Sequence, residues 1–336
     1  MSISYPNRVV SIPAGVVMVV TDLHSDWPMY QRYRDVFLGL HAQGLAHTLL
    51  FTGDVIHNEN LPEDDRSIEI VTDILKLRDE LGDALVMLLG NHELAHIYPF
   101  VLSKGSHVYT TEFEHAMGQR RKAIVDFFDG LPFYARTPAG VTLCHAGAFS
   151  QARDPVAMAQ VLAFSHRDLL QAGATRIPQE HLTEFFEAFD AAQSIPYEQL
   201  VRTFFGVTGP EDPRFYDYLI AQLAMQQPAF DLLWEVLFNR NELDYGEVKY
   251  SGYVLDLLRA LSRDYAPQRV LVTGHIRCAN GYHIVAGNQQ LRLASATHAR
   301  PFQSARYLLF DAAKPVDNAE DLLPGLGSVF ANLLEN

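Results

Sequence analysis

Cysteine is scarce in this sequence. Only two occur among its 336 residues, Cys144 and Cys278. Two cysteines cannot form the disulfide framework that is typical of small secreted domains, so the cytoplasm is the expected compartment. We expect both thiols to be small core residues rather than a redox switch.

Long hydrophobic runs are also missing. No stretch approaches the roughly 20 apolar residues that are needed to span a bilayer. The longest early apolar run, residues 14–20, follows no basic segment and precedes no small-residue cleavage site. We therefore interpret it as a strand rather than a signal peptide, and we expect no membrane partner.

Positive charge is the third shortage. The 26 Lys and Arg residues face 40 Asp and Glu residues, which leaves a formal net charge of -14. This balance opposes a broad footprint on the phosphate backbone of nucleic acid, so we expect no nucleic-acid partner. The hydrophobic content of 48% is enough for a large core in one large domain.

Short apolar runs alternate with helical patterns through the first half of the chain. The expected strands are 16–20, 48–51 and 84–89, and the expected helices are 30–42, 67–80 and 112–128. Residues 133–136 and 141–144 are expected to form a hairpin. This order is typical of an α/β fold.

A mostly helical, aromatic-rich stretch follows, and strands resume near the end of the chain. The later strands are expected at 269–273, 282–285, 290–294 and 306–310. We therefore predict one catalytic domain over residues 1–311, in which residues 151–265 form a mostly helical insertion placed to act as a substrate cap. Residues 312–336 are expected to form a C-terminal tail that docks on the domain.

Five short motifs each place Asp, Asn or His directly after an apolar run. They are Asp22-Leu-His24, Gly53-Asp54, Gly90-Asn91-His92-Glu93, Cys144-His145-Ala-Gly147 and Gly274-His275. We expect these side chains to converge where strands end and loops begin. Two carboxylates, a carboxamide and three imidazoles suit a pair of divalent first-row ions, which can hold a phosphate for attack. The sequence therefore predicts phosphoester hydrolysis.

In this order, the motifs resemble those of the calcineurin-like metallophosphoesterases, specifically the phosphoprotein phosphatase branch. Residues 127–132 and 231–234 add to the resemblance, which spans roughly residues 16–311. It implies a four-layer α/β/β/α sandwich with two mixed sheets face to face. It also implies a site with two divalent ions, where manganese is the expected metal and iron and zinc are alternatives.

The resemblance also implies which residues hold these ions. Asp22 and His24 would hold one ion, Asp54 would bridge both, and Asn91, His145 and His275 would hold the other. More distant relatives carry a further histidine where this chain has Arg277, which favours the six-ligand set.

By the same resemblance, metal-bound hydroxide attacks the phosphate and His92 protonates the leaving alkoxide as general acid. The chain departs from the branch just after Asp54, where His57-Asn58-Glu59 replaces an acidic residue, an arginine and a glycine. The group that orients His92 therefore stays open. The candidates are Glu59, Glu93 and Asp26, or His57 through a different hydrogen-bond arrangement.

Phosphate also needs cationic contacts, because guanidinium donors match its oxygens. The candidates are Arg240 and Arg277, with Tyr282 as a further substrate contact by its spacing in the resemblance. The remaining histidines of interest have no motif around them, so we expect surface or packing roles. They are His166, His181, His283 and His298.

The sequence thus predicts a metal-dependent phosphomonoesterase that resembles the serine/threonine protein phosphatases. Its substrate would be a phosphopeptide or a small phosphorylated molecule. Two alternatives stay open. One is a dinucleoside polyphosphate pyrophosphohydrolase, suggested by His145-Ala-Gly147, and the other is a catalytically inactive binding module.

Overall fold

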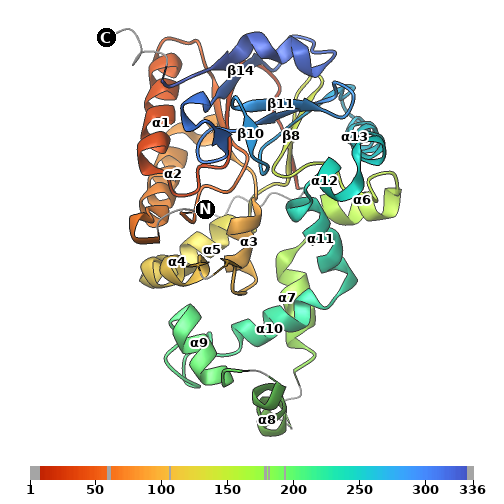
Figure 1. The fold of residues 1–336 in the computed structure, drawn as a ribbon. Helices are drawn as coiled ribbons and strands as arrows, with labels where there is room; N and C mark the ends of the chain where they lie inside the picture. The colour runs from red at the N-terminus through yellow and green to blue at the C-terminus, as the bar shows by residue number, and fades with distance from the viewer. Residues whose placement is uncertain are drawn as a thin grey trace.

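Two main β-sheets with helices packed outside them form the body of the molecule (Figure 1). The computed structural model describes residues 8–58, 62–105, 107–177, 180, 182–192 and 194–330. The predicted α/β architecture with two mixed sheets is confirmed.

One sheet has five strands in the order β15-β14-β2-β3-β4, of which β2, β3 and β4 run parallel. Its strands are β2 (Val16–Val20), β3 (Thr48–Phe51), β4 (Leu85–Met87), β14 (Tyr307–Asp311) and β15 (Leu326–Gly327). Strand β14 joins β2 in antiparallel fashion, so the end of the chain completes a sheet that its beginning starts.

The other sheet has six strands in the order β1-β7-β8-β9-β12-β11, of which β8, β9 and β12 run parallel. Its strands are β1 (Val9–Ser11), β7 (Tyr134–Arg136), β8 (Val141–Cys144), β9 (Val270–Thr273), β11 (Tyr282–Val285) and β12 (Gln290–Leu293). Strands β7 and β8 pair antiparallel, which confirms the predicted hairpin. Two small ladders add β5 (Ser103–Lys104), β6 (His107–Val108), β10 (Cys278–Ala279) and β13 (Ala299–Arg300).

The core between the sheets follows from the alternation of side chains along each strand. On β2, Val17 and Val19 pack in a cluster with Val141 and Val272 of the other sheet. Met18, which points the opposite way, packs in the cluster that the helices cover. Burial on both faces explains why the strands are continuous apolar runs rather than alternating ones.

Helices cover the outer faces of the two sheets. The helices before the β7–β8 hairpin are α1 (Trp27–Ala42), α2 (Ser67–Leu81), α3 (Asn91–Ile97), α4 (Thr110–Met117) and α5 (Arg121–Asp129). The single helix predicted over residues 112–128 is wrong, because the chain breaks into α4 and α5 at Gly118. Gly118 has φ 48°, a left-handed conformation that a helix interior cannot contain.

Between β8 and β9 the described chain forms helices and no strand. They are α6 (Pro155–Leu162), α7 (His166–Ala174), α8 (Leu182–Ala192), α9 (Tyr197–Phe205), α10 (Asp217–Met225), α11 (Pro228–Phe238), α12 (Glu242–Tyr245) and α13 (Glu247–Leu261). The described residues between 177 and 223, hereafter the lobe, have a separate hydrophobic core that includes Tyr197 and Phe215. The lobe extends away from the sheets (Figure 1).

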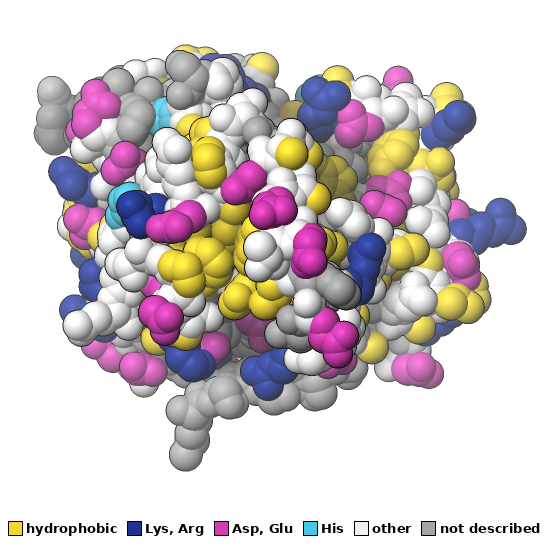
Figure 2. All heavy atoms as spheres, turned by 90° about the horizontal axis from the view of Figure 1, so that it is seen from below, with side chains coloured by type: hydrophobic (Ala, Val, Ile, Leu, Met, Phe, Trp, Pro, Cys, Tyr) yellow, Lys and Arg dark blue, Asp and Glu magenta, His cyan; other side chains and the backbone are white. Residues whose placement is uncertain are grey.

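Seen from below, the molecule shows hydrophobic side chains near the middle of the face, with Asp and Glu side chains around them (Figure 2). None of the described helices is long and apolar enough to cross a membrane.

The segment after β14 packs onto the body. Ala312, Val316, Ala319 and Leu322 belong to the core between the sheets, and β15 extends the five-stranded sheet. The described part of the predicted C-terminal tail is therefore docked.

Candidate metal centre

The motif residues lie at the carboxyl ends of the parallel strands. Asp22 and His24 follow β2, Asp54 follows β3, and Asn91 begins α3 after β4. His145 follows β8 and His275 follows β9 in the other sheet. Both sheets present these ends to one place, so the six residues converge in a buried cluster.

The backbone turns sharply at this cluster. Asp22 and His24 each have φ 46°, Asp54 has φ 52° and His275 has φ 67°. Left-handed backbone is uncommon outside glycine and persists where surrounding contacts enforce it, often at functional sites. The strand ends are therefore held in a conformation that the chain would not adopt by itself.

Two motif glycines allow the carboxylates to come close to neighbouring backbone. A Cβ at Gly90 would collide with Oδ1 of Asp54, and a Cβ at Gly274 would collide with Oδ2 of Asp22. The backbone amides beside these glycines also hold the carboxylates. His92 N–H donates to Oδ1 of Asp54 at 2.9 Å, and His275 N–H donates to Oδ1 of Asp22 at 2.8 Å.

Asp54 stands between two groups of histidines. Its Oδ2 lies 3.4 Å from Nε2 of His145 and 3.9 Å from Nε2 of His24. The carboxylate is therefore placed where one group can contact two ions at once, as a bridging ligand must.

On one side of Asp54, His145 meets Asn91 and His275. Nε2 of His145 lies 2.8 Å from Oδ1 of Asn91 and 3.1 Å from Nδ1 of His275. Nδ1 of His145 donates to the carbonyl oxygen of Thr52 at 3.1 Å, because a carbonyl can only accept. The neutral ring therefore turns the lone pair of Nε2 toward Asn91 and Asp54.

Burial keeps these imidazoles neutral. Burial, with the neighbouring His275, holds the pKa of His145 well below its ordinary value. Burial, with His298, lowers the pKa of His275 to about 4. Neutral imidazole is the form that binds a metal.

The donor set fits a metal ion on its own chemistry. The Nε2 lone pair of His145 faces a carboxylate oxygen of Asp54, and two acceptors repel each other unless a cation lies between them. Asp54, His145 and His275 each offer a ligand atom within 4.8 Å of the others. Nitrogen and oxygen ligands of this mixture suit divalent first-row ions.

On the other side of Asp54, the cluster contains a histidine that the sequence analysis assigned to packing or the surface. His298 is buried, its Nδ1 lies 3.7 Å from Oδ1 of Asp22, and its ring centre lies 4.7 Å from that of His24. Asp22, His24 and His298 form a second group whose ligand atoms lie within 4.8 Å of one another. His298 is therefore a further candidate ligand, beside the six that the resemblance implies and beyond the surface or packing role expected from the sequence.

His92 lies beside this centre and contacts His57. Its ring centre is 4.7 Å from that of His24, and its Nδ1 is 3.0 Å from Nδ1 of His57. Of the groups left open for orienting His92, the structure places His57 in contact with it. His57 stands where the resemblance expects an acidic residue.

The other groups left open have different partners in the structure. Glu93 accepts backbone N–H groups of Asp54 and Val55 at 2.9 Å each and of Gly90 at 3.2 Å. Burial raises the pKa of Glu93 to about 7, although these hydrogen bonds lower it. Asp26 caps α1 by accepting Met29 N–H, and Glu59 lies outside the described residues.

The three substrate contacts expected from the sequence lie at the surface or on a strand. Arg240 is mostly exposed and its guanidinium binds Asp244, with Nη2 2.8 Å from Oδ1. Arg277 is exposed just after His275, and the half-buried Tyr282 packs against the core between the sheets. None of the three lines the cleft described next.

A cleft of about 380 Å³ opens beside His24. The described residues that line it include Asp26, Asn58, Arg66 and Thr297. Arg66 is the arginine among these lining residues, its backbone N–H donates to the Ser25 hydroxyl, and its Nη1 lies 3.9 Å from Oε1 of Glu69. Arg66 directly precedes α2 and lies outside every motif, so the sequence by itself gives no signal for it.

The remaining histidines divide between core and surface. His166 is buried against the Tyr98 hydroxyl, with Nδ1 and the oxygen 3.1 Å apart, and His283 is exposed on β11. Their expected packing and surface roles are confirmed. His181 lies outside the described residues.

Comparison with known proteins adds a family match. The model of the calcineurin-like phosphoesterases matches residues 15–195, more than half of the 336-residue chain. A protein serine/threonine phosphatase from Saccharomyces cerevisiae with similarity to human phosphatase PP5 is similar at 12% identity and a TM-score of 0.47, over 90% of this chain and 76% of that one. A cold-active protein-tyrosine phosphatase of a psychrophilic Shewanella species is similar at 14% identity and a TM-score of 0.41, over 91% of this chain and 78% of that one. The comparison with curated proteins gave no match.

Proposed function

The chain belongs to the calcineurin-like phosphoesterases, and from that premise we propose that it is a phosphomonoesterase that depends on two divalent metal ions. The observation that carries this proposal is the position of Asp54. Its Oδ2 lies between Nε2 of His145 and Nε2 of His24, at 3.4 and 3.9 Å, where it can bridge two ions.

The ligands divide between the two ions by their contacts. Asp22, His24 and His298 would hold the first ion, Asn91, His145 and His275 the second, and Asp54 both. When bound, the ions would neutralise phosphate charge and activate the attacking water. Manganese is the expected activator in vitro, and iron or zinc would also suit nitrogen and oxygen ligands.

His92 would protonate the leaving oxygen. Its Nδ1 contacts His57, so we assign the transferred proton to Nε2. As the phosphorus–oxygen bond to the leaving group breaks, that proton moves to the departing oxygen and an alcohol leaves. A general acid of this kind typically contributes about 10²- to 10⁴-fold to the rate.

The cleft beside His24 supports a small or accessible phosphate ester as substrate. Its volume of about 380 Å³ suits one phosphorylated side chain or a small molecule, and Arg66 offers a cationic contact for phosphate oxygens. The net charge of -14 disfavours a polyanion such as nucleic acid. Arg277 and Tyr282 stay as predicted substrate contacts.

A substrate panel tests the proposal. The protein should hydrolyse an activated aryl phosphate, and some phosphoserine or phosphothreonine peptides, in the presence of manganese. Chelator should abolish the activity and elemental analysis should give about two ions per chain. Full activity in chelator, or no hydrolysis of any phosphomonoester with metal present, would refute the proposal.

The same panel separates this function from its alternatives. Efficient cleavage of dinucleoside polyphosphates without phosphopeptide activity would favour the pyrophosphohydrolase instead. The variant His92→Asn should keep its metal and lose more activity on alkyl phosphates than on an activated aryl phosphate, because acid catalysis helps poor leaving groups most. An equal loss on both would remove the acid role of His92.

A further inference from the structure

A chain of buried side chains leads away from His92. Nδ1 of His92 lies 3.0 Å from Nδ1 of His57, whose Nε2 lies 2.8 Å from Nε2 of His96. Nδ1 of His96 in turn lies 2.8 Å from Oε1 of Glu114. His57 and His96 are fully buried and Glu114 is 3% exposed, so four consecutive side chains connect the metal centre with α4.

From these contacts we propose that His57, His96 and Glu114 form a hydrogen-bonded relay that fixes the ring orientation and tautomer of His92. They would therefore be positioning residues for its proton transfer. The inference rests on the proposed function, because it assumes that His92 acts as the acid.

The outer end of the relay is a carboxylate with a permanent charge. Burial by itself would raise the pKa of Glu114, but the hydrogen bond with His96 and the guanidinium of Arg121 outweigh it and hold the pKa below its ordinary value. Arg121 Nε donates to Oε2 of Glu114 at 2.7 Å, and Nη2 donates to Oε1 at 3.3 Å. Glu114 therefore stays an acceptor at neutral pH.

An ionised Glu114 sets the order of donors along the whole chain. Nδ1 of His96 must donate to it, and with one proton on each ring Nε2 of His96 accepts. Nε2 of His57 then donates to His96, and Nδ1 of His57 accepts from Nδ1 of His92. With one proton on each ring, neutral His92 carries its proton on Nδ1, so a second proton is taken up on Nε2. The resulting imidazolium is the acid form, and it gives the Nε2 proton to the leaving oxygen and returns to the neutral Nδ1–H tautomer.

The middle ring has the charge state that this order requires. Burial, with His96, His24 and His107 nearby, holds the pKa of His57 well below its ordinary value. A neutral imidazole has one donor and one acceptor, which are the two roles that His57 must fill between His92 and His96.

Packing fixes the planes of the rings. Tyr109 stacks on His57 with ring centres 6.0 Å apart, and Phe113 packs its edge on His96 with ring centres 4.9 Å apart. Both aromatic side chains are buried. His92 and His96 share one face of α3, since residues four apart lie one above the other on a helix. These contacts therefore fix the relative orientation of the rings of His57, His92 and His96.

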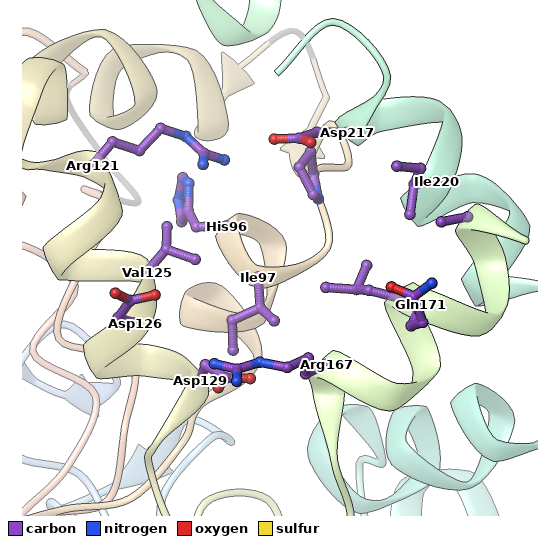
Figure 3. A pocket seen from close by; sticks show the side chains of 13 residues that line it. His96, Ile97, Arg121, Val125, Asp126, Asp129, Arg167, Gln171, Asp217 and Ile220 are labelled. Atoms are coloured by element: carbon purple, nitrogen blue, oxygen red, sulfur yellow. The ribbon is translucent and has the colours of Figure 1, made fainter. Parts of the chain in front are cut away.

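His96 of the relay and Arg121, which binds Glu114, line a cavity of about 330 Å³ between α3, α5, α7 and α10. Figure 3 shows Arg121 and His96 on one wall, with Asp217 and Gln171 on the other side. Gln171 lines the same cavity from α7 without belonging to the chain of histidines. It therefore offers a matched control.

Variants that break the chain one step at a time test the relay. His57→Phe and His96→Phe keep a ring of similar size but remove the hydrogen bonds. Both should lower kcat on an alkyl phosphate by about 10- to 100-fold, part of what a general acid supplies, and should leave KM and metal content unchanged. His57→Asp should lose less than His57→Phe, because a carboxylate can accept from His92 directly. Gln171→Ala should match the wild type.

Nitrogen NMR of zinc-loaded protein with ¹⁵N-labelled histidine gives a readout that does not depend on turnover. Wild-type protein should show protonated Nδ1 on His92, protonated Nε2 on His57 and protonated Nδ1 on His96. In His96→Phe, the preference of His92 for one tautomer should weaken.

The outcomes separate the relay from the function. Unchanged tautomers in His96→Phe, equal activity of His57→Asp and His57→Phe, or equal losses on alkyl and aryl phosphates would each overturn the relay. A wild-type protein that binds zinc and shows the predicted tautomers but hydrolyses no phosphate ester would overturn the proposed function, and with it the catalytic role of the relay.

Discussion

The strand-end site and the lobe bury opposite kinds of side chain. Around the site, Asp22, His24, Asp54 and His145 are almost completely buried, and three of them have left-handed or tightly turned backbone. In the described part of the lobe, the buried side chains are hydrophobic, as with Tyr197, Val201 and Phe215. Removing polar and charged groups from water costs free energy that their hydrogen bonds must offset, whereas burying apolar groups supplies free energy. The buried polar side chains of the site therefore provide ligands for metal ions but add little to the free energy of folding. The buried apolar side chains of the lobe, by contrast, stabilise its fold.

The largest expected effect comes from Asp54→Asn. Removing the bridging charge should lower turnover by more than about 100-fold and prevent the binding of two ions. The same variant should raise the melting temperature of the metal-free protein, because a buried carboxylate is lost. Asp79→Asn, an exposed change on α2, is the control. If Asp54→Asn is inactive and also less stable than the wild type, the buried polar groups of the site do not cost stability and the contrast with the lobe is wrong.

His298→Ala tests the ligand that the sequence analysis missed. Metal content should fall from about two ions per chain toward one, with a loss of turnover of about 10- to 100-fold. Elemental analysis and steady-state kinetics measure both effects. His283→Ala, at an exposed position on β11, is the matched control. Retention of both ions would return His298 to a packing role.

Arg66→Ala should raise KM for a phosphomonoester by about 10-fold and leave metal content unchanged, because a phosphate contact acts on substrate. Arg240→Ala should change KM less, since Asp244 holds that guanidinium. Arg277→Ala completes the series. A larger effect at Arg240 or Arg277 than at Arg66 would move the phosphate contact to that residue.

The stability of the metal-free protein should fall as pH falls from 7 to 5. The pKa of His275 is lowered to about 4 and that of His145 lies well below its usual value, whereas both are about 6.5 in the unfolded chain. The unfolded state then binds more protons throughout this window, so acidification favours unfolding by up to about 1.4 kcal/mol per pH unit for each group. Urea denaturation at both pH values measures it. His275→Asn should flatten the slope, and an unchanged slope would contradict the assignment.

The smallest effect on turnover is expected in the lobe. Tyr197→Ala should destabilise the lobe by about 3 kcal/mol or more, as large-to-small core changes do, while metal content and kcat stay near wild type. Hydrogen exchange measures the stability of the lobe, and steady-state kinetics measure kcat. Tyr33→Ala, in the core of the body, should lower global stability and activity together. A loss of metal binding in Tyr197→Ala would show that the lobe supports the site.

Features that depend on neighbouring residues in the sequence could be predicted, whereas features that depend on contacts between distant residues could not. The strands and the convergence of Asp22, Asp54 and His145 at their ends could be anticipated, because each motif is a local turn after a buried run. His298 could not, since it reaches Asp22 from a loop after β12 that has no local pattern. Arg66 is similar, because only the fold brings it beside His24.

The orientation of His92 shows the same limit more sharply. The sequence has His57 where an acidic residue is expected. The nearest carboxylate along the hydrogen-bonded chain is that of Glu114, and the rings of His57 and His96 lie between it and His92. No spacing rule connects residues 57, 96 and 114. Their contact depends on how α3 and α4 pack, which is a tertiary fact.

The break at Gly118 has a consequence for how this protein could be altered. In one unbroken helix, Glu114 and Arg121 would lie about 10 Å apart along the axis, yet the turn between α4 and α5 brings their side chains to 2.7 Å. Gly118 is exposed and remote from the metal centre, but its φ of 48° admits few other residues. Laboratory evolution for altered turnover should therefore recover substitutions at Gly118. Sequencing of the selected clones would show whether the backbone geometry at this surface position affects the rate of the reaction.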